Sequence, residues 1–297
     1  IAMVNNPYSR TRIAPTPSGY CHIGNALSFI LTAGLAKQCR AKILLRIDDL
    51  DRERFREEYL TDVFDTLLFL GIEWDEGPLN PEDFHARWSQ HLRMDLYHSR
   101  LDELRKKDVI FGCTCSRAEL AGLDRYPGTC IQRAFSPDLP ETAWRLKPDV
   151  CNSVSMATVD GMISVLQVPQ PVSCSVVRKK NGDAAYHLAS VADDDYFGVD
   201  LIVRGIDLYP STLFQLCLSS NFTDSTFGRC GFHHHPLVAG GDGMKLSKSA
   251  GSDSIRTMRL NGYSRLEVLS EIVKRSGGSG CPESWEECFS MLQPRLQ

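Results

Sequence analysis

The sequence of 297 residues predicts an α/β protein built on a doubly wound, Rossmann-like parallel sheet, with an inserted α+β subdomain and a short helical tail. Three observations lead to this fold class. Strand and helix patterns alternate at the start of the chain, the alternation returns after residue 184, and a cysteine-rich stretch with short strand patterns separates the two. The two halves of the sheet domain are expected at residues 1–110 and 184–263. The insertion between them is expected at residues 111–183, and the tail at residues 264–297.

The opening unit is a strand, a helix and a second strand, expected at residues 10–14, 25–37 and 42–47. A unit of this length implies a right-handed parallel crossover. In such sheets ligands bind beyond the carboxyl ends of the strands, which is where the turn at residues 15–18 and the acidic residues 48–51 fall.

The later elements follow from the same periodicities. A helix at residues 53–70 ends at Gly71, and apolar spacing over residues 84–104 predicts one long amphipathic helix. Further strands are expected at residues 143–147, 162–168, 172–178, 201–205 and 236–239, and further helices at 184–194, 211–218 and 266–273.

A turn rich in Pro, Ser and Gly joins the first strand to the first helix and ends in His22, Ile23, Gly24 and Asn25. A helix start offers unpaired N–H groups and a positive dipole end, which suit a phosphate. Gly24 has no Cβ and lets a flat ligand such as a purine come close, while His22 adds a compact donor. For this stretch alone, an ordinary strand–turn–helix with a surface histidine is the alternative.

A second candidate lies far downstream, where Lys245 and Lys248 follow the glycine-rich turn at residues 240–243. Two lysines three residues apart, with small hydroxyl side chains between them, can close over a triphosphate and offset the charge that develops when it is split. Taken alone, such a loop is more often a solvated linker.

Three carboxylates, Asp48, Asp49 and Asp51, follow the second strand. They can bind a cation or the ammonium group of an amino acid; alternatively they cap the next helix or pair with nearby arginines. We expect recognition from Asp48 and a structural role from the other two.

Cysteine spacing indicates a metal site. Cys113, Cys115 and Cys130 are brought together by one short loop, which suits a tetrahedral zinc site that needs one more ligand. Tyr126 would be an unusual ligand at the fourth position, and Asp124 is the alternative.

Composition narrows the class of protein. A hydrophobic content of 42% and a charged content of 24% are typical of a soluble globular protein, and no apolar run is long enough to span a bilayer. No charged leader before an apolar segment opens the chain, so we expect a cytoplasmic protein with no membrane partner. Eleven cysteines, mostly spread singly, argue against a disulfide framework.

The net charge of −4 does not indicate nucleic-acid binding, so any RNA must use local basic patches. Residues 105–107 and 178–180 are the candidates. A solvated charged face is the alternative for each.

Taken together, these stretches resemble a known family. Residues 22–25 (H-I-G-N) and 245–249 (K-L-S-K-S) resemble the two hallmarks of the class I aminoacyl-tRNA synthetases, written HIGH and KMSKS. Residues 12–19, 45–51 and 203–208 resemble further motifs of the glutamyl branch, R-F-A-P-S-P-T/S-G, L-R-I-E-D-x-D and V-R-G-x-D-L.

The second hallmark lies near the end of the sequence, where a full glutamyl-tRNA synthetase carries a further anticodon-reading portion. With the cysteine pattern, this arrangement is similar to the glutamyl-Q tRNA(Asp) synthetase family, in which three cysteines and a tyrosine hold zinc. The resemblance therefore implies Tyr126 as the fourth ligand.

The resemblance implies a two-step ligase that activates L-glutamate with ATP, with Mg2+ expected, and transfers it to queuosine in the anticodon of tRNA(Asp). Glutamate would contact Arg12, Ala14, Thr16, Asp48, Tyr186 and Arg204, with Arg204 on its side-chain carboxylate. Catalysis and ATP binding would use His22, Gly24, Asn25, Lys245 and Lys248, and Zn2+ would be held by Cys113, Cys115, Tyr126 and Cys130.

Three residues depart from the family pattern, one of which is Ile131, which follows Cys130 where a basic residue is common. Asn25 replaces the second histidine of HIGH, and its amide can still donate a hydrogen bond. Asp48 replaces a glutamate and is one methylene shorter. Two other functions stay open: a minimal glutamyl-tRNA synthetase that charges tRNA(Glu), and a zinc-stabilised RNA-binding protein without catalysis. A monomer is expected.

Overall fold

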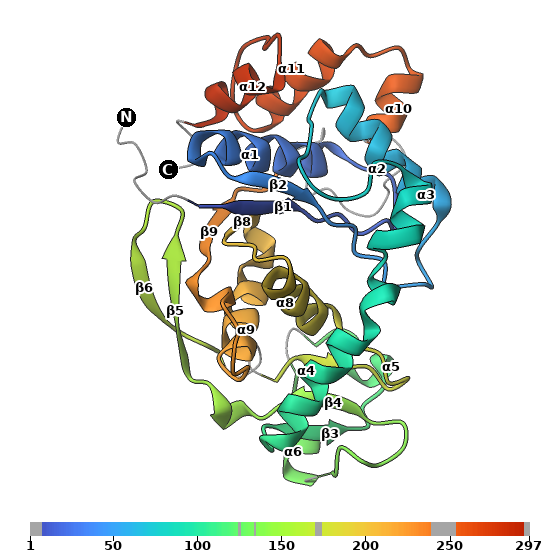
Figure 1. The fold of residues 1–297 in the computed structure, drawn as a ribbon, viewed down its shortest axis with the longest axis vertical. Helices are drawn as coiled ribbons and strands as arrows, with labels where there is room; N and C mark the ends of the chain where they lie inside the picture. The colour runs from blue at the N-terminus through green and yellow to red at the C-terminus, as the bar shows by residue number, and fades with distance from the viewer. Residues whose placement is uncertain (1–7, 124–125, 134, 170–173, 239–253, 294–297) are drawn as a thin grey trace. The chain divides into compact units, whose positions relative to one another are not determined.

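The structure is a computed structural model, and the residues it describes are 8–123, 126–133, 135–169, 174–238 and 254–293 (Figure 1). The strands are β1 (Arg10–Ile13), β2 (Lys42–Leu45), β3 (Ile110–Cys113), β4 (Ala143–Leu146), β5 (Ser153–Thr158), β6 (Ile163–Gln167), β7 (Val176–Arg178), β8 (Leu201–Gly205) and β9 (Gly231–His235). The helices are α1 (Ile23–Cys39), α2 (Glu57–Leu70), α3 (Pro81–Asp83), α4 (Met94–Lys106), α5 (Arg117–Leu120), α6 (Thr129–Arg133), α8 (Tyr186–Tyr196), α9 (Tyr209–Ser219), α10 (Ile255–Leu260), α11 (Arg265–Arg275) and α12 (Trp285–Leu292). Shorter helical turns span Phe84–Trp88, Gln90–Arg93, Pro148–Val150, Ile206–Leu208 and Phe227–Arg229.

The chain forms two compact units. The first consists of residues 1–92, 201–207 and 233–297, and the second of residues 93–200 and 208–232. Strand β9 begins in the second unit and ends in the first.

Parallel strands form the centre of the first unit. β1 pairs in parallel with β2, in a register that sets Ile13 opposite Leu45, and pairs with β8 between Thr11 and Leu201. The apolar side chains of these strands are buried, as expected of a parallel sheet covered by helices. The predicted parallel strand–helix–strand unit is therefore confirmed.

Helix α1 lies against this sheet, and Figure 1 shows α11 and α12 on the side of α1 away from β1 and β2. The close approach of α12 needs Gly34 of α1, because a Cβ there would lie 2.2 Å from the ring of Phe289 in α12. Both C-terminal helices begin at a serine, Ser264 or Ser284, whose hydroxyl accepts a backbone N–H three residues on. The predicted tail helix at residues 266–273 is confirmed.

The second unit holds the antiparallel sheet β3–β4–β7 and the hairpin of β5 and β6, and the other edge of β5 pairs with the start of β9. Helix α4 packs on α8, where the buried carboxylate of Asp193 accepts hydrogen bonds from Arg93 and Tyr97. The predicted strands at residues 143–147 and 162–168 are confirmed, whereas β3 and β5 were not predicted.

The long helix predicted over residues 84–104 is wrong in its first half, because the regular helix α4 begins only at Met94. The break lies at Ser89, whose hydroxyl donates to Asp49 at 2.6 Å, while the N–H of Gln90 donates to the same carboxylate at 2.8 Å. A buried side chain that takes this backbone N–H removes the donor that would continue the helix.

The strand predicted at residues 236–239 is misplaced. β9 runs over Gly231–His235 and ends before Pro236, which has no N–H for a strand ladder. Ala239 lies outside the described residues. Within the described ranges, no helix is long and apolar enough to cross a membrane.

Candidate functional site

The start of α1 is shaped by His22 and Asn25, two of the predicted nucleotide contacts. His22 is the N-cap: its Nδ1 accepts the N–H of Gly24 at 3.0 Å, and its own N–H donates to the side-chain oxygen of Asn25 at 3.0 Å. Because Nδ1 accepts, the proton of a neutral ring sits on Nε2, which makes Nε2 the donor. A Cβ at Gly24 would lie 2.9 Å from the His22 ring, so this glycine makes room for the cap.

The loop before α1 is held from two sides. The backbone N–H of Cys21 donates to the buried carboxylate of Asp62 at 2.7 Å, and the Cys21 carbonyl accepts the N–H of Ile255 at 2.8 Å. His22 and Ser254 form an antiparallel bridge. Ser254 and Ile255, at the start of α10, therefore pair with His22 and Cys21, at the start of α1.

A side-chain contact extends this pairing by one residue. Arg256 lies over the ring of Tyr20 at 4.7 Å and donates to its hydroxyl at 2.6 Å. Lys245 and Lys248 themselves lie outside the described residues. Ser254 follows Ser249 by five residues, a chain length of at most about 18 Å.

Two predicted glutamate contacts, Arg12 and Arg204, lie on the neighbouring strands β1 and β8. Both are buried, and Arg12 donates to the carbonyl of Val203 at 3.5 Å. Burial, followed by the positive charge of Arg204, lowers the pKa of His234 to about 4. The end of β8 thus combines a buried cation with a neutral imidazole.

Asp48 lies close to the turn that carries Ala14 and Thr16, since its N–H donates to the carbonyl of Pro15 at 2.9 Å. The two oxygens of its carboxylate accept hydrogen bonds from Nε and Nη2 of Arg46, at 2.8 and 3.0 Å. Both side chains are buried. An ammonium ligand at Asp48 would share the carboxylate with Arg46, which the residue pattern does not reveal.

The other two carboxylates of this cluster have partners within the protein, and their structural role stays a prediction. Asp49 accepts hydrogen bonds from Ser89 and Gln90, and Asp51 pairs with Arg54 at 2.6 Å. Neither arrangement needs a ligand.

Tyr186 is the first residue of α8 and is exposed by 41%. It belongs to the second unit, whereas Arg204 belongs to the first. A shared glutamate pocket of Tyr186 and Arg204 stays a prediction.

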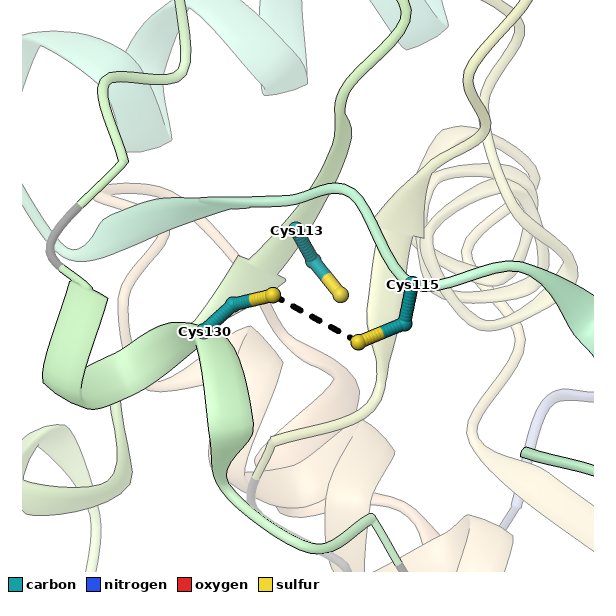
Figure 2. A group of neighbouring side chains, drawn as sticks. All are labelled: Cys113, Cys115 and Cys130. Carbon is teal, nitrogen blue, oxygen red and sulfur yellow. Dashed lines mark hydrogen bonds between the residues drawn. The ribbon is translucent and has the colours of Figure 1, made fainter. Parts of the chain in front are cut away.

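Cys113, Cys115 and Cys130 come together beside β3, and their sulfur atoms lie within 4.8 Å of one another (Figure 2). The sulfurs of Cys115 and Cys130 are 3.4 Å apart, and the hydroxyl of Tyr126 lies 3.7 Å from the sulfur of Cys113. Ligand sulfurs around a tetrahedral Zn2+ lie roughly 3.8 Å apart when the bonds are about 2.3 Å. The three thiols therefore fit a zinc ion, and Tyr126 as the fourth ligand stays a prediction. Asp124 lies outside the described residues.

The thiols differ in acidity. Burial opposes ionisation of Cys130, but hydrogen bonds from the Thr114 backbone and the Tyr126 side chain outweigh it and lower the pKa of the thiol to about 6. Burial, followed by contact with the other two thiols, raises the pKa of Cys115 to about 12. Of these two thiols, Cys130 is the one more readily present as the thiolate that binds metals.

The first of the two predicted RNA patches is partly neutralised within the protein, and one lysine of the second makes a hydrogen bond to the backbone. Arg105 pairs with Asp138, and Lys107 pairs with Glu103 at 2.9 Å. In the second patch, Lys180 donates to the carbonyl of Thr114 at 2.6 Å, next to the cysteine cluster. Nucleic-acid contact by either patch stays a prediction.

Hydrogen bonds between residues far apart in the sequence were not predicted. The hydroxyl of Ser28 on α1 forms a hydrogen bond with the ring of His235 on β9 at 2.6 Å. The carboxylate of Asp62 on α2 accepts the N–H of Cys21, just before α1. For Asp62 a weak signal exists, because an acidic residue stands between apolar positions on a buried helix face. For Ser28 and His235 the sequence offers none.

Comparison with known proteins agrees with this geometry. Residues 9–128 match the family described as class I tRNA synthetases (E and Q), catalytic domain. A glutamyl-Q tRNA(Asp) synthetase of Parasynechococcus marenigrum is 35% identical over 97% of this chain and 89% of its own length. One of Symbiobacterium thermophilum is 32% identical over 92% of this chain and 88% of its own length.

Glutamate–tRNA ligases match as well. Glutamate–tRNA ligase 2 of Nitrosococcus oceani is 32% identical over 92% of this chain and 60% of its own length. The chain thus spans about 60% of the length of such ligases. The solved glutamate-tRNA synthetase of Elizabethkingia anophelis superposes with a TM-score of 0.71 over 89% of this chain and 61% of that chain, at 21% identity, so it shares the fold.

The mixed, largely parallel sheet with its helices is therefore the class I synthetase fold, as predicted. The chain belongs to the class I aminoacyl-tRNA synthetase family of ligases, among the glutamyl-tRNA synthetase-like proteins that include the glutamyl-Q tRNA(Asp) synthetases.

Proposed function

We propose that this protein activates L-glutamate with ATP and transfers the glutamyl group to queuosine in the anticodon of tRNA(Asp). The observation that carries the proposal is the pairing of Cys21 and His22 with Ile255 and Ser254. The residues that follow the 245–249 stretch by a few positions thus meet the helix start that would receive ATP. The family relationship supports the same chemistry.

In the first step a glutamate α-carboxylate oxygen bonds to the α-phosphorus of ATP, and the bond to the bridging oxygen breaks, so that pyrophosphate leaves. His22 would donate from Nε2, and Asn25 from its amide, to the nucleotide at the α1 start. Lys248, assisted by Lys245, would stabilise the charge on the leaving phosphates, with Mg2+ neutralising the rest.

The glutamate site would use the two buried arginines. Arg204 would fork onto the side-chain carboxylate, and Arg12, Ala14 and Thr16 would line the site from β1 and its turn. Asp48, braced by Arg46, would face the ammonium. Tyr186 would complete the pocket.

In the second step a hydroxyl oxygen of the nucleoside attacks the acyl carbon, and AMP leaves. Positioning and charge stabilisation would supply most of the rate, because little covalent chemistry falls to side chains. Support for queuosine as acceptor comes from the relatives with that activity in their name, which this chain covers by 88% and 89%. A zinc ion held by Cys113, Cys115, Cys130 and Tyr126 would have a structural role. The proposal also includes that the enzyme is monomeric and cytoplasmic.

Two measurements test the proposal. Glutamate-dependent ATP–pyrophosphate exchange reports the first step, and its absence in the zinc-loaded protein with tRNA present would leave only an RNA-binding function. Labelled glutamate offered to tRNA(Asp) with and without queuosine reports the acceptor. Equal labelling of both would defeat the choice of queuosine, and labelling of tRNA(Glu) alone would indicate a minimal glutamate–tRNA ligase.

A further inference from the structure

We propose that Arg145 is the counter-charge and positioning residue of the three-cysteine metal site. Arg145 lies on β4 and is only 7% exposed. Its Nη1 donates to the carbonyl of Cys174 at 2.9 Å, and the guanidinium carbon lies 4.1 Å from the ring centre of Tyr126. Among the residues that the structure describes, no carboxylate pairs with it, and its buried Nε has no hydrogen-bond partner.

The strand register places Arg145 on the face of the sheet that carries the metal site. In the β3–β4 ladder Arg145 stands opposite Phe111, and Ala143 stands opposite Cys113. Directly opposed side chains of an antiparallel pair lie on the same face, and residues two apart along a strand share that face. Arg145 and Cys113 therefore project from the same side, where Phe111, Cys113 and Cys130 form one buried cluster.

Charge balance gives the reason for this placement. A buried cation without an anionic partner is costly, and a buried anion is equally so. Zn2+ held by three thiolates carries a net charge of about −1, before any contribution from the fourth ligand. The positive charge of Arg145 therefore balances the negative charge of the zinc-loaded site. The ring of Tyr126 lies between them, and its face attracts the guanidinium by a cation–π interaction.

The same contact orients the fourth ligand. The hydroxyl of Tyr126 accepts the N–H of Cys130 at 3.0 Å and lies 3.7 Å from the sulfur of Cys113. A guanidinium stacked on the ring face keeps the ring in the plane that aims this hydroxyl at the thiols. Residues that orient a metal ligand from outside typically govern metal affinity by about 10- to 100-fold.

The chain provides a matched control on the opposite face of the same sheet. Arg178 of β7 lies over the ring of Trp144 at 4.6 Å, and these two residues pair directly across the strands. Arg178→Met removes an arginine–aromatic contact from this sheet without touching Tyr126 or a thiol. Arg145→Met removes the contact that the proposal needs, and Arg145→Lys keeps the charge but loses the planar stack.

The first experiment measures zinc affinity of the full chain by competition with a chelating dye, with circular dichroism as the check on folding. We expect Arg145→Met to weaken zinc binding by about 10- to 100-fold and Arg145→Lys to fall between it and the wild type. Arg178→Met should stay within about threefold of the wild type. The proposal is overturned if Arg145→Met also stays within threefold, if Arg178→Met loses as much, or if the wild type binds no zinc.

A second experiment separates this role from plain packing. In thermal unfolding with excess chelator, Arg145→Met should be as stable as the wild type or more stable, since it removes a buried cation that lacks a partner. With zinc bound, the same variant should unfold at a lower temperature than the wild type. An equal loss in both states would show that Arg145 only packs against Tyr126. Neither readout uses the ligase reaction, so this proposal and the proposed function can fail independently.

Discussion

Gly34 offers a direct test of how the C-terminal helices are held on the sheet unit. The ring of Phe289 occupies the space beside this glycine, and a Cβ here would lie 2.2 Å from two ring atoms and 2.5 Å from a third. Ordinary contacts of such atoms begin at about 3.5 Å, so the ring or the helix must move by roughly 1 Å in a tightly packed interior. Phe289 is buried, so it cannot simply swing into solvent.

Two effects of Gly34→Ala oppose each other. Alanine favours the helix by about 1 kcal/mol over glycine. Overpacking in a close-packed contact costs about 1–3 kcal/mol, and the severity of this overlap puts Gly34→Ala at the upper end. The net expectation is a loss of about 2 kcal/mol in the free energy of unfolding.

Urea denaturation followed by circular dichroism measures this loss. Gln38→Ala, at an exposed position of the same helix, is the control for helix propensity and should change stability by less than about 0.5 kcal/mol. Phe289→Ala should cost about 3–5 kcal/mol, and the double variant should cost less than the sum, because the new methyl group then fills vacated space. A Gly34→Ala protein as stable as the wild type, or strictly additive losses, would refute the packing argument.

Four further outcomes are expected. Gly24→Ala should lower ATP–pyrophosphate exchange at least tenfold, because its Cβ would displace the His22 ring from the helix cap; unchanged exchange would separate the cap from ATP binding. Lys248→Ala should raise the barrier to exchange by about 2–4 kcal/mol, and a loss below tenfold would remove it from the phosphates. The pKa of His234 in the folded protein is about 4, below its ordinary value of 6.5, so the unfolded chain takes up the proton first as the pH falls. The free energy of unfolding should therefore decrease as the pH drops from 6.5 to 4. In urea titrations at several pH values, His234→Gln should make this pH dependence weaker. Chelation of zinc should lower the melting temperature of the wild type, and an unchanged melting curve would argue against a structural metal.

Local chemistry made much of the fold predictable. The strand–helix–strand unit follows from an apolar run, a helical period and a second apolar run, and the cysteine cluster follows from the spacing of Cys113, Cys115 and Cys130. These features depend on neighbours in the chain, which periodicity and loop length reveal.

What could not be predicted depends on partners far away in the sequence. The helix break at Ser89 is caused by Asp49, forty residues earlier, and the fork of Arg46 on Asp48 depends on how both are buried. The position of Arg145 over Tyr126 depends on the register of two strands. A single sequence contains these residues but not the pairing that gives them their roles.

The route of the chain between its two units bears on how the protein is made. Thr11 on β1 bonds through its hydroxyl to Leu201, 190 residues further on. At a synthesis rate of about 5–20 residues per second, the nascent β1 edge waits roughly 10–40 s for β8 to emerge. During that time the edge of β1 that will pair with β8 is open to wrong association, and the intervening residues 93–200 must collapse separately. Newborn chains of this protein should therefore depend on ribosome-associated chaperones more than their modest size suggests.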